Sequence, residues 1–170
     1  MSEPAETSET VPVTGITTPI KMEYRYTPGT ATSQFLRAMK EGRFEGRRCP
    51  SCSKVYFPPR GGCSMCGVEF AETVALANSG TIATYTVVNV NFANRTVDLP
   101  YIVAEVVFDG ADVTTALLLK GVAPDEVRQG MRVEAKWIPQ EEWDFSLTNI
   151  SHVEPLDEPD APVESYRDSI

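Results

Sequence analysis

The second half of the chain has the hydrophobic pattern of a β-rich domain. After residue 71, β-branched and aromatic residues alternate with polar ones between turn signals such as Asn78-Ser79-Gly80 and Asp109-Gly110. This pattern predicts strands near residues 72–77, 80–91, 100–108, 112–120, 131–138 and 145–152. A single helical turn is expected between Gly121 and Gly130. Five or six strands with a short helical insertion fit a small closed barrel, of which the OB-fold is the best-known five-stranded kind; a β-sandwich is the alternative.

The N-terminal part is predicted to form an extended arm followed by one short helix. Hydrophobic residues of the arm occupy every second position, which is the period of a strand or of an extended segment with one apolar side. They are Ile20, Met22, Tyr24 and Tyr26. After a turn at residues 27–29, Thr32 or Ser33 can cap a helix that ends at Gly42. The apolar face of this helix is expected to contain Phe35, Leu36 and Met39.

Both ends of the chain lack the residues needed for a core. Residues 1–19 are rich in Glu, Thr, Ser and Pro, and residues 154–170 carry six acidic residues against one basic residue. Such segments are disordered alone or become ordered on a partner. The sequence thus divides into an N-terminal arm (1–29), a helix (30–43), a cysteine-containing segment (44–71), a barrel (72–153) and an acidic C-terminal tail (154–170).

Four cysteines form two CxxC pairs separated by ten residues. Each pair can direct two thiolates from one tight turn towards a single ion, and two such turns complete a tetrahedron without an open position. Four cysteines in a reducing compartment are more typical of metal binding than of disulfides. Iron, as in rubredoxin, and a redox role are the alternatives, because spacing alone does not separate zinc from iron. We therefore predict a rubredoxin-like structural zinc ribbon over residues 44–71, with the ligands Cys49, Cys52, Cys63 and Cys66.

Composition and charge narrow the possible functions. The 170 residues are 42% hydrophobic, which is typical of a globular protein. Neither a run of about 18 apolar residues nor a signal-peptide pattern is present, so we expect a soluble, cytoplasmic protein without membrane partners. The formal charge of −9 argues against nucleic-acid binding, yet seven of the fifteen basic residues lie between residues 37 and 60. That basic segment is either a solvated face or a site for a phosphate-bearing ligand or an acidic partner.

No catalytic constellation is evident in the sequence. The one histidine, His152, falls at the end of the last predicted strand, and all four cysteines are assigned to the metal. Arg60-Gly61-Gly62-Cys63 lacks the strand, loop and helix of a phosphate-binding loop. Aromatic residues of the barrel are a possible stacking platform for a single-stranded nucleic acid, although aromatic strand residues are more often core. They are Tyr85, Phe92, Tyr101 and Phe108.

Several short stretches carry a resemblance to a known family. They are Phe35-Leu36 and Glu41-Gly42-Arg43 in the helix, Arg48-Cys49-Pro50-Ser51-Cys52, Val55-Tyr56-Phe57-Pro58-Pro59-Arg60 and Cys63-Ser64-Met65-Cys66-Gly67 in the ribbon, and Gly80-Thr81-Ile82, Tyr85-Thr86-Val87-Val88, Pro100-Tyr101, Gly121-Val122, Asp125-Glu126-Val127 and Gly130-Met131-Arg132-Val133 in the barrel. Together they span about residues 33 to 138. In this order, the chain resembles the acyl-CoA-associated zinc-ribbon and OB-fold proteins, catalogued as domain of unknown function thirty-five.

The resemblance implies a role beside another enzyme. Proteins of this kind usually work with thiolase-like enzymes that cleave or form C–C bonds in acyl-CoA substrates, including aldolases that shorten steroid side chains. The chain is then a non-catalytic subunit, with catalytic residues on the partner, acyl-CoA at a shared site and a heterotetrameric assembly. A free-standing acyl-CoA-binding protein and a single-stranded nucleic-acid binder are the alternatives. Because coenzyme A carries phosphates, the candidate ligand or partner contacts are Arg47, Arg48, Lys54 and Arg60.

Overall fold

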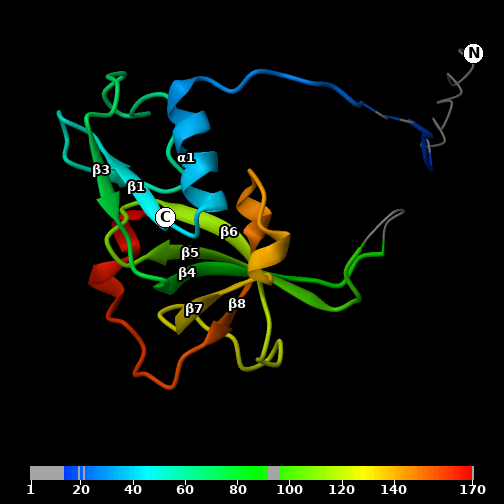
Figure 1. Cartoon of the computed structure of the whole chain (residues 1–170). Coiled ribbons are helices and arrows are strands. Elements are labelled where there is room, and N and C mark those ends of the chain that lie inside the picture. The colour runs from blue at the N-terminus through cyan, green and yellow to red at the C-terminus, as the bar shows by residue number, and fades with distance from the viewer. Residues whose placement is uncertain (1–13, 19, 21, 92–95, 170) are drawn as a thin grey trace, which may run out of the picture.

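The computed structural model describes residues 14–18, 20, 22–91 and 96–169 of the chain. Its centre is a closed five-stranded β-barrel with the strand order β4-β5-β6-β8-β7 (Figure 1). The strands are Ser79–Val88 (β4), Tyr101–Phe108 (β5), Thr114–Leu119 (β6), Arg132–Trp137 (β7) and Ile150–Pro155 (β8). All neighbouring strands are antiparallel except β6 and β8, which meet in parallel at Leu119 and Val153. The barrel is the OB-fold that the strand pattern predicted, not a sandwich.

A second, smaller sheet forms the strands of the ribbon. Its strands are β1 (Glu45–Arg48), β2 (Val55–Tyr56) and β3 (Glu72–Ala75), in the order β2-β1-β3. The first strand that the sequence predicts after the cysteines is β3, and it pairs with β1 from Glu45↔Ala75 to Arg48↔Glu72. This strand therefore completes the ribbon sheet, and the five later strands make the barrel.

The helix α1 (Thr30–Lys40) begins at residue 30, where the sequence division places the helix, and thus ahead of the predicted caps Thr32 and Ser33. Gly29 is the N-cap and gives no side-chain cap, whereas Ser33, one of the two predicted caps, donates its hydroxyl hydrogen to the carbonyl oxygen of Pro28 at 3.2 Å. Gly42 follows the helix with φ of +71°, as expected for the residue that ends it. A Cβ atom at this position would collide with the ring of Trp143.

One aromatic cluster joins the helix, the ribbon and the barrel. Phe57 from the ribbon has no exposed surface, and its ring centroid lies 4.3 Å from that of Phe44 and 5.6 Å from that of Phe108. Phe35 of α1 contacts Phe57 edge-on, with ring centroids 5.7 Å apart. These rings continue into the aliphatic interior of the barrel, so the described residues share one main core.

Two local predictions in the barrel were wrong. The segment between Gly121 and Gly130 forms turns and no helix, although Val127 within it is buried. The last strand begins only at Ile150, after the short 3-10 helices Gln140–Glu142 and Leu147–Asn149. The cause of the delay is Asn149, which is 1% exposed and donates its side-chain amide to the carbonyl oxygens of Met39, at 3.1 Å, and Asp144, at 2.8 Å.

The acidic C-terminal tail folds back onto the barrel, whereas its composition predicted disorder or ordering on a partner. Tyr166, between the 3-10 helices Val163–Ser165 and Arg167–Ser169, is 6% exposed and packs with Ala83 and Val107. The backbone amide of Ala161 donates to the carbonyl oxygen of Gly130 at 2.8 Å. One buried tyrosine thus anchors a segment that is otherwise too polar to form a core.

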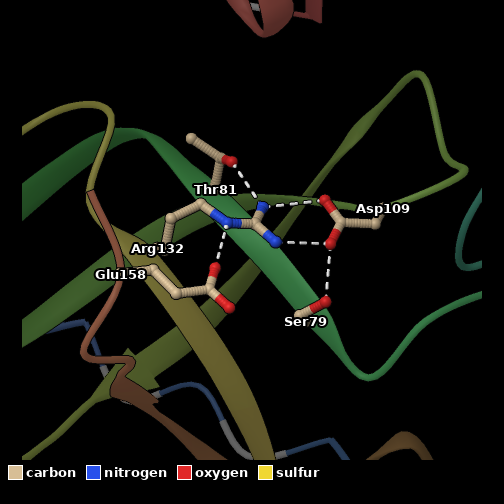
Figure 2. Close-up of polar contacts among 5 residues, drawn as sticks. All are labelled: Ser79, Thr81, Asp109, Arg132 and Glu158. Atoms are coloured by element: carbon tan, nitrogen blue, oxygen red, sulfur yellow. Dashed lines mark hydrogen bonds and ion pairs between the residues drawn. The ribbon is translucent and has the colours of Figure 1, made fainter. Parts of the chain in front are cut away.

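Two arginines, one shortly before β7 and one at its first residue, bind carboxylates of the tail. Arg128 donates two hydrogen bonds to Asp160, at 2.6 and 2.8 Å. Arg132 lies at the centre of a polar network that includes Glu158 of the tail (Figure 2). The guanidinium of Arg132 is charged at physiological pH like that of any arginine, and its bond to Asp109 raises its pKa further above the ordinary value. The net negative charge of the tail is therefore partly neutralised by the barrel.

Candidate metal centre

The first CxxC pair lies in a tight turn that follows β1. The backbone amide of Cys49 donates to the carbonyl oxygen of Lys54, and that of Ser53 donates to the carbonyl oxygen of Cys49, at 2.9 and 3.0 Å. Ser53 adopts φ of +63°, which closes the turn. The amides of Ser51 and Cys52 point at the sulfur of Cys49, at 3.4 and 3.5 Å. Such N–H···S contacts stabilise a thiolate at the start of the turn.

The second pair repeats the same turn. The amide of Cys63 donates to the carbonyl oxygen of Val68, and that of Gly67 donates to the carbonyl oxygen of Cys63, both at 2.9 Å. Gly67 occupies the place of Ser53 and has nearly the same φ, +68°. Two equivalent turns therefore face each other across the ribbon.

The four thiols meet between these turns. Their sulfur atoms all lie within 4.8 Å of one another, and those of Cys52 and Cys63 are 3.7 Å apart. A tetrahedral zinc ion with Zn–S bonds of ~2.3 Å requires sulfur–sulfur distances of about 3.8 Å. The donor set and its spacing fit one zinc ion with four thiolate ligands. Such a site has no open coordination position for water or substrate, so its chemistry is structural.

The surroundings of the thiols shift their pKa values in opposite directions. The hydroxyl of Tyr56, 3.4 Å from the sulfur, and the backbone amides of Cys66 and Met65 lower the pKa of Cys63 to about 6. The amide of Lys54 lowers the pKa of Cys52, but burial and the neighbouring thiols outweigh it and raise this pKa to about 12. The site thus favours the thiolate form of Cys63 and disfavours the thiolate form of Cys52. A divalent cation removes that conflict, since it favours the deprotonated form of every ligand.

The metal site is tied to the barrel by contacts that the sequence did not reveal. Asp112, in the β5–β6 turn, accepts the amide hydrogen of Val55 on its carboxylate at 2.7 Å and donates its own amide to the carbonyl oxygen of Val55 at 2.8 Å. Thr115 of β6 donates its hydroxyl hydrogen to the carbonyl oxygen of Phe57 at 2.8 Å. All three bonds join residues more than 50 positions apart, so no local pattern indicates them.

The four basic candidates near the site have different surroundings. Arg47 donates a hydrogen bond to Gln34 of α1 and lines a cavity of about 420 Å³ between the start of α1 and the ribbon. Arg48 pairs with Glu72 of β3 at 3.2 Å. Lys54 is half-buried in the first turn, and Arg60 is exposed. Arg47 also lines a second, much smaller cavity beside Phe35 and Pro59.

The four aromatic residues considered as a stacking platform have different surroundings. Phe108 is 1% exposed and belongs to the core, while Tyr85 and Tyr101 are half-buried. Phe92 lies outside the described residues.

The histidine His152 is half-buried in β8, between the hydroxyl of Ser151 at 2.9 Å and the carboxylate of Glu154 at 3.2 Å.

Within the residues that the structure describes, no helix is long and apolar enough to cross a membrane.

Known protein families match both parts of the molecule. The family described as ChsH2, rubredoxin-like zinc ribbon domain, matches residues 37–71, and the family described as ChsH2, C-terminal OB-fold domain, matches residues 73–137. A DUF35 domain-containing scaffold protein of Methanocaldococcus jannaschii is 37% identical over 93 residues, which is 53% of this chain and 64% of that protein. A probable enoyl-CoA hydratase alpha subunit of Thermomonospora curvata is 31% identical over 105 residues, 61% of this chain and 32% of that protein. The chain thus spans less than two thirds of the length of either relative.

Solved structures show the same arrangement. The chain is similar to a structure titled Ltp2-ChsH2(DUF35) aldolase, with a TM-score of 0.54, 26% identity and coverage of 71% of this chain and 93% of that chain. A DUF35 protein of unknown function from Sulfolobus solfataricus has the same fold, with a TM-score of 0.54, 18% identity and coverage of 75% and 85%. The two family models follow each other in the same order as the ribbon and the barrel of this structure. The chain therefore contains the zinc ribbon and OB-fold domains described for ChsH2, and it is similar to proteins described as DUF35.

Proposed function

We propose that this chain is a zinc-containing, non-catalytic subunit of a thiolase-like enzyme that cleaves or forms C–C bonds in acyl-CoA substrates. The observation that carries the proposal is the match of both domains to ChsH2, together with the similar structure titled Ltp2-ChsH2(DUF35) aldolase. The names "subunit" and "scaffold protein" of the two relatives point the same way. In this proposal the four cysteines hold one structural zinc ion, and the catalytic residues belong to the partner.

The construction of the site supports a structural role for the metal. A closed set of four thiolates offers no position at which a substrate carbonyl could bind. The interior of the barrel is occupied by side chains such as Ile82, Val106 and Val133, each with no exposed surface. A chain with a filled barrel and a closed metal site acts through its surface, and we propose that this surface completes the acyl-CoA site of a heterotetramer with two copies of each subunit. A retro-aldol removal of a steroid side chain is the reaction that we propose to test first.

The decisive experiment is native mass spectrometry of the tagged, full-length chain purified from its host, with zinc measured in the same sample. We expect one zinc ion per chain and a companion subunit whose peptides identify it as thiolase-like, in an assembly with two copies of each. Retro-aldol activity should belong to this assembly and not to the isolated chain. A chain that carries zinc but has no thiolase-like companion would overturn the proposed function.

The basic residues provide a second test of the acyl-CoA part of the proposal. We propose that Arg47, Arg48, Lys54 and Arg60 contact either the phosphates of coenzyme A or an acidic surface of the partner. The double variant Arg48→Glu and Arg60→Glu separates these roles. Weaker acyl-CoA binding by an intact complex supports the ligand role, whereas loss of the complex itself supports the partner role. If the isolated chain binds acyl-CoA as tightly as the complex does, the chain is a free-standing carrier instead.

A further inference from the structure

The N-terminal arm presents a row of apolar side chains to solvent. Ile20, Met22, Tyr24 and Tyr26 are between 69% and 81% exposed, and Ile16 before them is 84% exposed. None of the described residues from 14 to 27 lies in a helix or strand, and the arm extends from α1 away from the body of the molecule (Figure 1). Elsewhere on the described surface, large hydrophobic residues with comparable exposure occur singly or in pairs. The arm is therefore the main unpartnered apolar segment of the described chain.

The apolar residues of the arm lie on one side of it. Tyr24 and Tyr26 are two positions apart, and their ring centroids are 6.1 Å apart with the planes tilted by 41°. Contact between side chains at i and i+2 is the geometry of an extended strand, in which alternate residues share a face. The intervening positions of the sequence are Lys21, Glu23 and Arg25. The segment from Ile20 to Tyr26 thus has the pattern of a strand with one buried face and one solvated face.

The size of this apolar face is a large part of one side of a protein interface. A tyrosine side chain buries on the order of 150–250 Å², and isoleucine and methionine bury somewhat less. The four residues from Ile20 to Tyr26, which are between 69% and 81% exposed, therefore offer roughly 500 Å² of the ~800 Å² that one partner contributes to an interface of standard size. So large a face on a segment that makes no strand of its own indicates a binding partner rather than a solvated linker.

A small apolar groove continues the surface at the base of the arm. Pro28, Leu36, Arg37 and Phe145 line this groove, together with Ser33. Phe145 is 52% exposed, and the ammonium group of Lys40 lies 4.4 Å from its ring centroid. A partner that binds the arm can therefore also contact the outer face of α1.

Charge opposes two of the possible occupants. The protein carries a formal charge of −9, so an anionic membrane surface repels it, and membrane-binding segments are typically rich in Lys and Arg on their polar face. A second copy of the chain carries the same −9 and is repelled for the same reason. A different protein with an open sheet edge remains, since an extended segment with alternating faces binds such an edge through its backbone.

We infer that residues Ile20–Tyr26 add as a strand to an open sheet edge of the thiolase-like partner and bury their apolar face against it. The inference rests on the proposed function for the identity of the partner. It assigns the arm as the principal docking element of the subunit and places the neighbouring groove of α1 at the rim of the same interface. Backbone hydrogen bonds give this contact its geometry, and the tyrosines and Met22 give it affinity.

The test compares two serine variants of the full-length chain, each assayed for binding to the purified partner. The first replaces the apolar face: Ile20→Ser, Met22→Ser, Tyr24→Ser and Tyr26→Ser. The matched control replaces the opposite face: Lys21→Ser, Glu23→Ser and Arg25→Ser. We expect the first variant to bind at least about 100-fold more weakly, because several buried anchors are lost together, and the control to bind within about threefold of the unmodified chain. Both variants should keep one zinc ion per chain, since the ribbon is untouched.

Hydrogen exchange tests the strand itself. In the complex, about half of the backbone amides between residues 20 and 26 should become protected, because a strand at an edge donates alternate amides to its neighbour. If the unmodified chain binds the partner but these amides exchange freely and the apolar variant binds normally, the inference fails while the proposed function stands. If the unmodified chain forms only a dimer of itself that the apolar variant abolishes, the occupant is a second copy and the inference is overturned. If no thiolase-like partner exists at all, the proposed function is overturned, and the inference about its docking strand is overturned with it.

Discussion

The Arg132 network should be the most costly polar cluster of the barrel to disrupt. The guanidinium donates to both carboxylate oxygens of Asp109, at 2.8 and 2.6 Å, to the hydroxyl of Thr81 at 2.9 Å and to Glu158 at 3.1 Å. Its side chain is only 16% exposed, and Ser79 adds a hydrogen bond to the same Asp109 carboxylate at 2.5 Å (Figure 2). The network joins the starts of β4 and β7 to the end of β5 and to the C-terminal tail.

Replacing Arg132 by methionine keeps most of the side-chain volume and removes the charge and the donors. The hydroxyl of Thr81, a residue that is only 5% exposed, then loses its hydrogen-bond partner, which costs roughly 1 kcal/mol. The bidentate pair between Arg132 and Asp109 is lost as well. The side chain of Asp109 is 40% exposed, so solvent screening reduces the value of the ion pair to about 1 kcal/mol. We expect a loss of about 2 kcal/mol in the free energy of unfolding, or a fall in Tm of about 4–8 °C for a chain of this size.

Chemical denaturation and a double-mutant cycle with Asp109→Asn measure these terms separately. The matched control is Arg128→Met, because Arg128 also binds a carboxylate of the tail but its side chain is 56% exposed; its loss should cost clearly less stability than the loss of Arg132. A coupling energy of about 1 kcal/mol between Arg132 and Asp109 is expected at neutral pH. A cost below about 0.5 kcal/mol for Arg132→Met, in a protein that retains its zinc, would refute the reasoning.

The same pair has a defined pH dependence. The hydrogen bonds from Arg132, and then that from Ser79, lower the pKa of Asp109 below its ordinary value of 3.8. A carboxylate with a lowered folded-state pKa stabilises the protein fully above its unfolded-state pKa and loses that contribution as pH falls towards the folded-state value. The difference in stability between the unmodified chain and Asp109→Asn should therefore be constant above pH ~4 and shrink below it. Both proteins have the same ribbon, so loss of zinc in acid cancels in this comparison.

Three further changes test the turns, the metal and the tail. Cys66→Ser should reduce zinc well below one ion per chain, and full zinc retention would remove Cys66 from the ligand set. Gly42→Ala should destabilise the protein by about 2 kcal/mol or more, because φ is +71° and the new methyl group meets Trp143; Gly67→Ala, with φ of +68° and open space around it, should cost only about 1 kcal/mol. Equal costs for the two glycines would show that the Trp143 contact contributes nothing. Tyr166→Ala should release the tail to limited proteolysis without changing the zinc content, and an unchanged cleavage rate would contradict its role as the anchor.

The sequence predicts those parts of this protein that depend on local patterns. The CxxC spacing predicts the meeting of four thiols, and alternation with turn residues predicts the barrel strands to within a few positions, because both signals lie within short windows. The tail is different: its composition indicates disorder, whereas the contact of Tyr166 with Ala83 and Val107 and the bonds from Arg128 and Arg132 anchor it. The late start of β8 likewise depends on a bond from Asn149 to Met39, 110 positions away. Long-range pairs of this kind have no periodic signal in a single sequence.

The position of Phe57 predicts that the zinc ion supports more than the ribbon. Phe57 follows β2 directly, has no exposed surface and packs between Phe44 and Phe108, while Asp112 of the barrel holds the backbone of Val55. When zinc is removed, the ribbon has too small a core to stay folded, and the barrel loses the covering of its aromatic cluster. Chelation should therefore lower the unfolding temperature of the whole chain, measured by the near-ultraviolet signal of Trp137, whose ring lies 6.1 Å from that of Phe44. A barrel that unfolds at the same temperature with and without zinc would mean that the ribbon is an independent appendage, and that the aromatic cluster contributes little to holding the two parts together.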